Sequence, residues 1–207
     1  MARILQREVP PFFPSEGPVY AFLLGEAPGP RGADRSGIPF WGDRAGLPLY
    51  LALEAAGMAQ VPPEAYEAWD GQRFRDLGLA PRLLGAALGN AFPACPTTDG
   101  ERFRAPSDAE LRHPGNTARL RAELGAARDR CPGTLAVLAL GRRAGWILDQ
   151  LGLDSAVEVL PHPSAQGLLQ AAPNRGKGLK LADLQADWEA RLARRLVQLR
   201  TEIQRVR

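Results

Sequence analysis

Cysteine is scarce in this sequence, because only Cys95 and Cys131 occur among its 207 residues. The two cysteines lie far apart and form no CxxC pair. Two thiolates cannot supply the four ligands that an iron–sulfur cluster usually needs. We therefore predict no metal and no cofactor, and we expect no disulfide in a reducing cytoplasm.

Long apolar runs are also absent, and none of the runs present is long enough to span a bilayer. Residues 1–7 are followed by Glu8 and by prolines, not by the apolar core of a signal peptide. These absences predict a cytoplasmic protein with no membrane partner, and we expect a monomer. A chain of 207 residues can form one α/β domain with a sizeable core, which would cover 1–207.

Lysine and histidine are rare as well. The chain has 24 arginines but only two lysines, and its formal net charge is +3. The planar guanidinium group suits phosphate contacts, but a GC-rich genome produces the same bias, so the composition alone is weak support for a nucleic-acid partner. The two histidines are His113, for which we expect a solvated position in a helical stretch, and His162.

Strand-like and helix-like patterns alternate along the chain. Strands are predicted at 19–24, 86–92, 134–140 and 156–160, the first two of them as buried strands. Helices are predicted at 46–57, 107–130, 141–151 and 181–207. This alternation is typical of an α/β fold in which three α/β/α layers surround a central, mostly parallel four-stranded sheet.

The remaining segments are less regular. Residues 1–18 read as an irregular arm because four prolines interrupt them. The Gly-rich, charged segment 30–45 reads as a long functional loop. Ser107 and Glu110 form a capping-box pattern at the start of a helix that is interrupted near Pro114. The segment 60–84 remains ambiguous, with a short helical stretch near 64–69.

The predicted strands end in polar or Gly/Pro-rich turns. Glu26 lies in the turn Gly-Glu-Ala-Pro-Gly after the first strand, Asn90 lies at the end of the second, and His162 follows the fourth between two prolines. In a parallel sheet these turns converge on one edge, which is where α/β proteins bind ligands. The sequence therefore predicts a site that contains a carboxylate, an amide and an imidazole.

Five motifs, taken in their order along the chain, resemble those of the uracil-DNA glycosylase superfamily. The resemblance is strongest to family 4 of that superfamily, whose typical members carry an iron–sulfur cluster. The motifs are GEAPG at 25–29, SGIPFWG at 36–42, Asn90 followed by Cys95, LALGRRAGWIL at 138–148 and HPSAQG at 162–167. The resemblance runs from Gly25 to about Pro173. It implies the fold of that superfamily and a monofunctional DNA glycosylase that removes a flipped-out deaminated base, uracil in the first instance, in base-excision repair.

The resemblance also implies roles for single residues. Glu26 would orient water and stabilise the cationic sugar, and His162 would hydrogen-bond the departing base. Phe40 would stack on the base and Asn90 would read its edge. The base-binding set is Ala27, Gly29, Phe40 and Asn90. The DNA-binding set is Ser164, Gln166, Leu168, Arg175 and Lys177, with Leu168 as the wedge that enters the helix.

Each of these residues also has a structural interpretation. Glu26 can cap the following helix, and His162 and Asn90 can be turn residues. Phe40 can belong to the core, and the stretch 175–180 can be a solvated loop.

The sequence departs from the family pattern in ways that change the expectations. The paired cysteines expected before the first strand are absent from 9–14, while Cys95 occupies one cluster position and His113 lies near another. The stretch between Gly57 and Asn90 is longer than the family pattern, and the loop from Gly29 to Phe40 is about one residue longer. Strict uracil specificity is therefore open, with hypoxanthine and xanthine as alternatives.

Two activities of related enzymes are not expected. No Arg-rich insertion precedes the HPS motif, so we predict no covalent bond to DNA through His162. No lysine nucleophile lies at the motifs, so we predict no lyase activity. The alternatives from other classes are a noncatalytic DNA-damage-binding module on the same fold and an enzyme acting on a nucleotide or phosphate ester.

Overall fold

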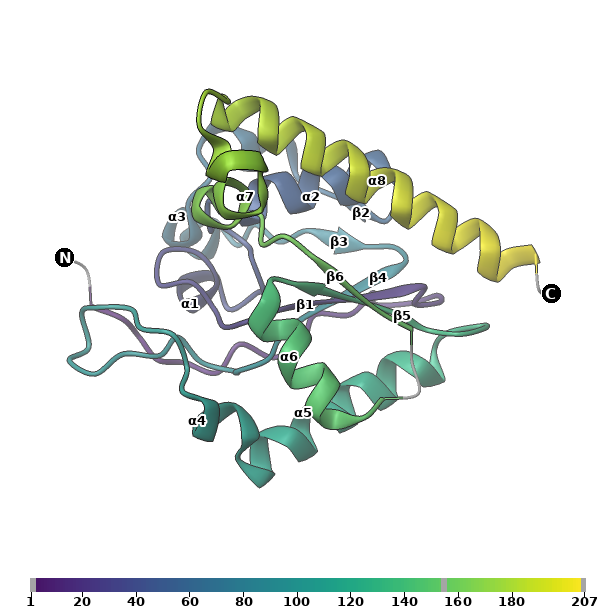
Figure 1. The fold of residues 1–207 in the computed structure, drawn as a ribbon, viewed down its shortest axis with the longest axis horizontal. Coiled ribbons are helices and arrows are strands. Elements are labelled where there is room, and N and C mark those ends of the chain that lie inside the picture. Colours follow the sequence, from purple (N-terminus) through teal and green to yellow (C-terminus); the bar gives the residue numbers. More distant parts are fainter. Residues whose placement is uncertain (1–2, 154–155, 206–207) are drawn as a thin grey trace.

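The computed structural model describes residues 3–153 and 156–205. Its centre is a four-stranded, all-parallel sheet in the order β4-β1-β5-β6. The strands are β1 (Ala21–Gly25), β4 (Ala86–Asn90), β5 (Ala136–Leu140) and β6 (Ala156–Leu160). Helices α2 (Gly46–Ala55) and α8 (Leu181–Arg205) cover one face, and α5 (Pro114–Asp129) and α6 (Arg142–Leu151) cover the other (Figure 1). The predicted three-layer α/β/α fold is confirmed.

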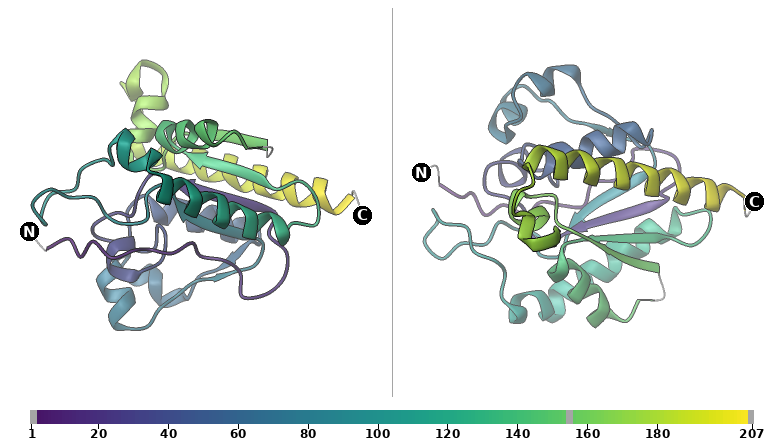
Figure 2. Two further views of the ribbon diagram at one scale, coloured as in Figure 1. Left: turned by 90° about the horizontal axis from the view of Figure 1, so that it is seen from below. Right: turned by 45° about the horizontal axis from the view of Figure 1, so that its top comes forward.

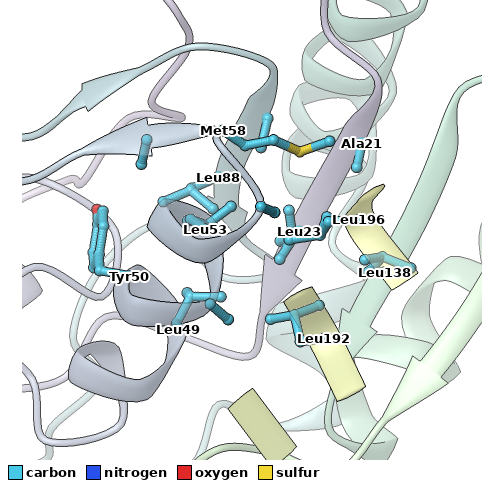
Figure 3. Close-up of a cluster of buried hydrophobic side chains, with 14 of the residues drawn as sticks. Ala21, Leu23, Leu49, Tyr50, Leu53, Met58, Leu88, Leu138, Leu192 and Leu196 are labelled. Atoms are coloured by element: carbon cyan, nitrogen blue, oxygen red, sulfur yellow. The ribbon is translucent and has the colours of Figure 1, made fainter. Parts of the chain in front are cut away.

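Strand β1 separates two cores because successive side chains of a strand point to opposite faces. Leu23 packs with Leu49 and Leu53 of α2 and with Leu192 and Leu196 of α8 (Figure 3). The neighbouring residues of β1 belong to the second cluster, on the side of α5 and α6. Burial on both faces explains why β1, β4 and β5 read as continuous apolar runs. The edge strand β6 differs, because Val157 and Val159 are exposed.

The predicted helix at 107–130 is two helices. Ser107 and Glu110 form the expected capping box at the start of α4 (Asp108–Arg112). The chain then leaves the helical conformation at His113, and α5 begins at Pro114, a residue that suits the first turn of a helix. His113 is exposed as expected, but it lies between the helices and accepts a hydrogen bond from the Gly115 amide at Nδ1.

The segment 60–84, which the sequence left ambiguous, forms a small substructure beside the main sheet. A two-stranded antiparallel ribbon, β2 (Ala59–Gln60) and β3 (Arg82–Leu83), encloses the 3-10 helix η1 (Pro63–Glu67) and helix α3 (Gly71–Asp76). Trp69 and Phe74 of this segment pack against Trp41 and Tyr50, with ring centroids 4.4 to 5.8 Å apart. The segment therefore packs against the loop that carries Trp41 and holds that loop in place.

Three short helices lie outside the helices predicted from the sequence. Helix α1 (Ala33–Ser36) interrupts the predicted loop 30–45, and α7 (Ala165–Ala171) and η2 (Pro173–Gly176) follow the HPS motif. At the chain ends, positions 1–2 of the predicted arm and 206–207 of the predicted last helix lie outside the described residues. Within 3–153 and 156–205, no helix has both the length and the apolar character needed to cross a membrane.

Residues 3–18 of the N-terminal arm contain no helix, but backbone hydrogen bonds attach them to the rest of the protein. The amide of Ile4 donates to Gly100 O at 2.7 Å, and the amide of Val9 donates to Pro93 O at 2.8 Å. The Leu5 amide donates to Oδ2 of the buried Asp34 at 2.7 Å. The arm thus ties α1 to the long loop that follows β4.

Candidate active site

A cleft of about 1100 Å³ lies at the carboxyl ends of the parallel strands. All but two of the predicted site residues line it: Glu26, Ala27, Gly29, Phe40, Asn90, His162, Ser164, Gln166 and Arg175. The exceptions are Leu168 and Lys177. The structure therefore brings together predicted residues from the ends of β1, β4 and β6, as the parallel topology predicted, and Leu140 and Gly141 at the end of β5 line the same cleft.

Glu26 follows β1 directly, and its carboxylate pairs with an arginine. Arg143, in the first turn of α6, donates from Nε to Oε1 of Glu26 at 2.7 Å. The same guanidinium bonds Asp108 Oδ1 at 2.9 Å and Pro106 O at 2.7 Å. The carboxylate that bonds the amides at the start of α1 is Asp43, so the alternative interpretation of Glu26 as a helix cap does not fit.

His162 is held as a neutral imidazole. Its Nδ1 accepts a hydrogen bond from the Ser164 amide at 3.2 Å, so in the neutral ring the proton is on Nε2. Burial lowers the pKa of His162 from 6.5 to about 4, because the charged ring would lose its hydration. Trp188 fixes the preceding residue by donating to Pro161 O at 3.0 Å. The ring therefore offers one N–H donor at neutral pH.

Asn90 and Phe40 meet at the inner end of the cleft. Asn90 is only 3% exposed, and its Nδ2 has no hydrogen-bond partner within the described part of the chain. Gly25 allows the close packing, because a Cβ there would lie 2.5 Å from Phe40 Cζ and 3.0 Å from Asn90 Oδ1. Phe40 has a left-handed φ of 63°, which is strained for an aromatic residue. Strain and an unpaired buried donor are typical of binding sites.

Asp43 is a second carboxylate at the cleft that the sequence analysis missed. Its oxygens accept the amides of Gly32 at 2.9 Å and Ala33 at 3.1 Å. Burial raises the pKa of Asp43, against the opposing effect of these backbone donors. The Trp69 indole Nε1 donates a hydrogen bond to the backbone carbonyl oxygen of Asp43 at 2.8 Å. The only sequence signal was its place beside Gly42 in the predicted functional loop.

Arginines give the cleft a positive rim that the sequence analysis only partly anticipated. Besides the predicted Arg175, the cleft is lined by Arg44, Arg142 and Arg143. Lys177 is exposed but outside the lining. The DNA wedge prediction for Leu168 does not fit the structure, because Leu168 is 5% exposed and packs in the core.

Residues 3–153 and 156–205 contain no group of three or more histidine, cysteine, aspartate or glutamate side chains that could hold a metal ion. Cys95 is buried, and burial together with the nearby Asp34 and Asp43 raises the pKa of its thiol to about 12.

No family model matches this chain. Over 69 residues, or 33% of its length, it is similar to proteins named type-5 uracil-DNA glycosylase: 38% identical to that of Mycobacterium leprae, and 39% to those of Mycobacterium bovis and Mycobacterium tuberculosis. The match covers 30%, 25% and 25% of these relatives, respectively. The predicted resemblance to the uracil-DNA glycosylase superfamily is confirmed over this third of the chain, with relatives of type 5 where the motifs had suggested family 4.

Proposed function

We propose that this protein is a monofunctional DNA glycosylase that hydrolyses the N-glycosidic bond of a flipped-out uracil and leaves an abasic site. The observation that carries the proposal is the buried Asn90 Nδ2, a donor without a partner in the described chain, in one cleft with Glu26 and neutral His162. Such a donor is stabilised by a ligand that brings an acceptor. The similarity to proteins named uracil-DNA glycosylase supports the same conclusion.

Base recognition uses the inner end of the cleft. The Asn90 amide donates to the carbonyl oxygen that deamination creates, where cytosine instead carries an exocyclic amino group that cannot accept that bond. The Phe40 ring stacks on the base, while Ala27 and Gly29 let the backbone approach it closely. Uracil fits these requirements, and hypoxanthine and xanthine share the carbonyl group.

Cleavage of the glycosidic bond develops positive charge on the sugar and negative charge on the base. The Glu26 carboxylate, held by Arg143 at 2.7 Å, orients the attacking water and stabilises the cationic sugar. His162 donates its Nε2–H to the base oxygen that becomes anionic. Because the ring is neutral, this hydrogen bond strengthens as charge develops, which lowers the barrier selectively.

The DNA backbone is bound by the positive rim of the cleft. Arg142 and Arg175 contact phosphates, with Lys177 just outside, and Ser164 and Gln166 lie at the same edge. Such contacts fix the register of the strand without reading its sequence.

The test is a base-release assay with oligonucleotides that contain one uracil, hypoxanthine or xanthine, in single- and double-stranded form. We expect free uracil and an alkali-labile site, with no strand cleavage before alkali. Release of hypoxanthine or xanthine alone would reassign the substrate. Binding to abasic DNA without any base release would favour the noncatalytic damage-binding module. If the protein neither binds DNA nor releases a base, both of these hypotheses are contradicted and a small-molecule substrate is favoured.

A further inference from the structure

Phe103 is an exposed aromatic residue at the mouth of the cleft. It lies on the loop 94–106, which projects from the body beside the N-terminal arm (Figure 2). Phe103 is 48% exposed and lines the same cleft as Glu26 and His162. Among the large exposed hydrophobic residues in the described ranges, Val159 is the only other one that lines it.

The loop that carries Phe103 forms a hairpin that is held by several backbone hydrogen bonds. Phe103 forms an antiparallel bridge with Thr97, and the Arg104 amide donates to Pro96 O at 3.1 Å. At the turn, Asp99 Oδ1 accepts the amides of Glu101 at 2.9 Å and Arg102 at 2.8 Å. The N-terminal arm fastens the turn through the bond from Ile4 to Gly100. The ring is therefore presented from a preorganised backbone, which reduces the entropy lost on binding.

Arginines flank the ring on both sides in the chain. The Arg102 side chain is 83% exposed and its Nε lies 4.0 Å from Oδ2 of Asp99, and Arg104 pairs with Glu110 at the base of the hairpin. Arg44, Arg142 and Arg175 line the cleft that Phe103 borders. An exposed aromatic ring among arginines is the arrangement with which proteins stack and hold unpaired nucleobases, because the ring binds the base face and the arginines bind the backbone.

We propose that Phe103 stacks against an unpaired nucleobase of the DNA strand, next to the nucleotide that occupies the cleft. The inference rests on the proposed function, since it takes DNA as the ligand of the cleft. It also provides a contact with the bases that the buried Leu168 cannot make, because the Leu168 side chain is only 5% exposed.

The experiment measures binding to a single-stranded oligonucleotide with 2-aminopurine beside an abasic-site analogue. Stacking quenches 2-aminopurine fluorescence. We expect Phe103→Ala to weaken binding about tenfold and to abolish the quenching, from the usual strength of base–aromatic stacking. Phe103→Leu, which keeps an apolar side chain of similar bulk, should lose the quenching too, whereas Phe103→Trp should retain both. Leu77→Ala removes a residue that is 58% exposed and outside the cleft, and serves as the control.

Three results separate this inference from the proposed function. Wild-type affinity and quenching in both Phe103→Ala and Phe103→Leu would overturn the stacking role and leave the glycosylase proposal intact. Phe103-dependent binding and quenching without base release from any substrate would support the stacking role and contradict the glycosylase. Failure of the wild type to bind the oligonucleotide would overturn the stacking role, while base release from the double-stranded substrates would still decide the glycosylase proposal.

Discussion

The Nε of Arg143 donates a hydrogen bond to Oε1 of Glu26 at 2.7 Å, across 117 residues of sequence. Arg143 also bonds Asp108 and Pro106, so one guanidinium joins the turn after β1, the start of α4 and the first turn of α6. Arginine suits this position because its planar fork holds several oxygens at fixed angles. The orientation of the Glu26 carboxylate therefore depends on a residue outside its own loop.

Replacing Arg143 should reduce turnover more than binding. In Arg143→Gln we expect kcat to fall about 10- to 100-fold with a small change in KM, since a misplaced carboxylate loses transition-state stabilisation. The free energy of unfolding should fall by about 1 kcal/mol or less, because both partners are partly exposed, at 37% and 29%. Steady-state kinetics and urea denaturation measure the two effects.

Arg142→Gln is the matched control for this change. It removes the same charge from the exposed neighbour in the cleft lining. We expect it to raise KM and to reduce the salt dependence of binding, with kcat nearly unchanged. Equal losses of kcat in the two variants would mean that Arg143 contributes only positive charge to the cleft and does not orient the Glu26 carboxylate.

The two carboxylates at the cleft can be distinguished by amide substitution. We expect Glu26→Gln to lower kcat about 100- to 1000-fold, because the amide keeps the shape and loses the charge. Asp43→Asn should have a smaller effect on kcat but a larger effect on stability, since Asp43 accepts two amides at the start of α1. The reverse pattern would move the water-orienting role to Asp43.

Asn90 should show a conflict between stability and function. Its Nδ2 is buried and has no partner in the described chain, so the free protein bears the cost of desolvating it. We expect Asn90→Leu to keep the free energy of unfolding within about 1 kcal/mol of the wild type, or to raise it, while kcat/KM falls at least about 100-fold. A loss of stability well beyond this range would indicate that the amide has a structural bond.

His162 should make stability depend on pH. Its pKa is lowered to about 4 in the folded protein, whereas the unfolded chain has the ordinary value of 6.5. As the pH falls below 6.5, the unfolded state takes up a proton that the folded state does not, so the contribution of His162 to stability decreases. Denaturation of wild type and His162→Asn at pH 7.5 and pH 5 should reveal a relative loss of about 1 kcal/mol in the wild type. A pH-independent difference would mean that the ring is well hydrated.

The same shift predicts how activity depends on pH. The neutral form of His162 persists well below pH 6, because burial keeps its pKa near 4. Titration of this ring should therefore leave kcat unaffected between pH 5 and 7.5. An acid limb with an apparent pKa near 6.5 that disappears in His162→Asn would contradict this assignment.

The sequence allowed the fold and the meeting of Glu26, Asn90 and His162 to be predicted, because buried parallel strands have a distinct pattern and their carboxyl ends share one edge. It did not reveal Asp43 or Arg143 as parts of the site, since both act through contacts with distant segments. Leu168 was misassigned for a related reason. An apolar residue after a conspicuous motif has the same sequence signal whether it faces solvent or the core.

The sheet order β4-β1-β5-β6 has a consequence for how the chain acquires its structure. Strand β1 is made first, but both strands that pair with it, β4 and β5, come much later in the chain. During synthesis β1 therefore emerges as an apolar segment without partners, and its pairing depends on slow, long-range closure. Since Glu26 reaches Arg143 only after α6 exists, no nascent fragment that ends before α6 can contain the complete site. Catalytic competence should therefore appear late in folding, after the outer strands have docked.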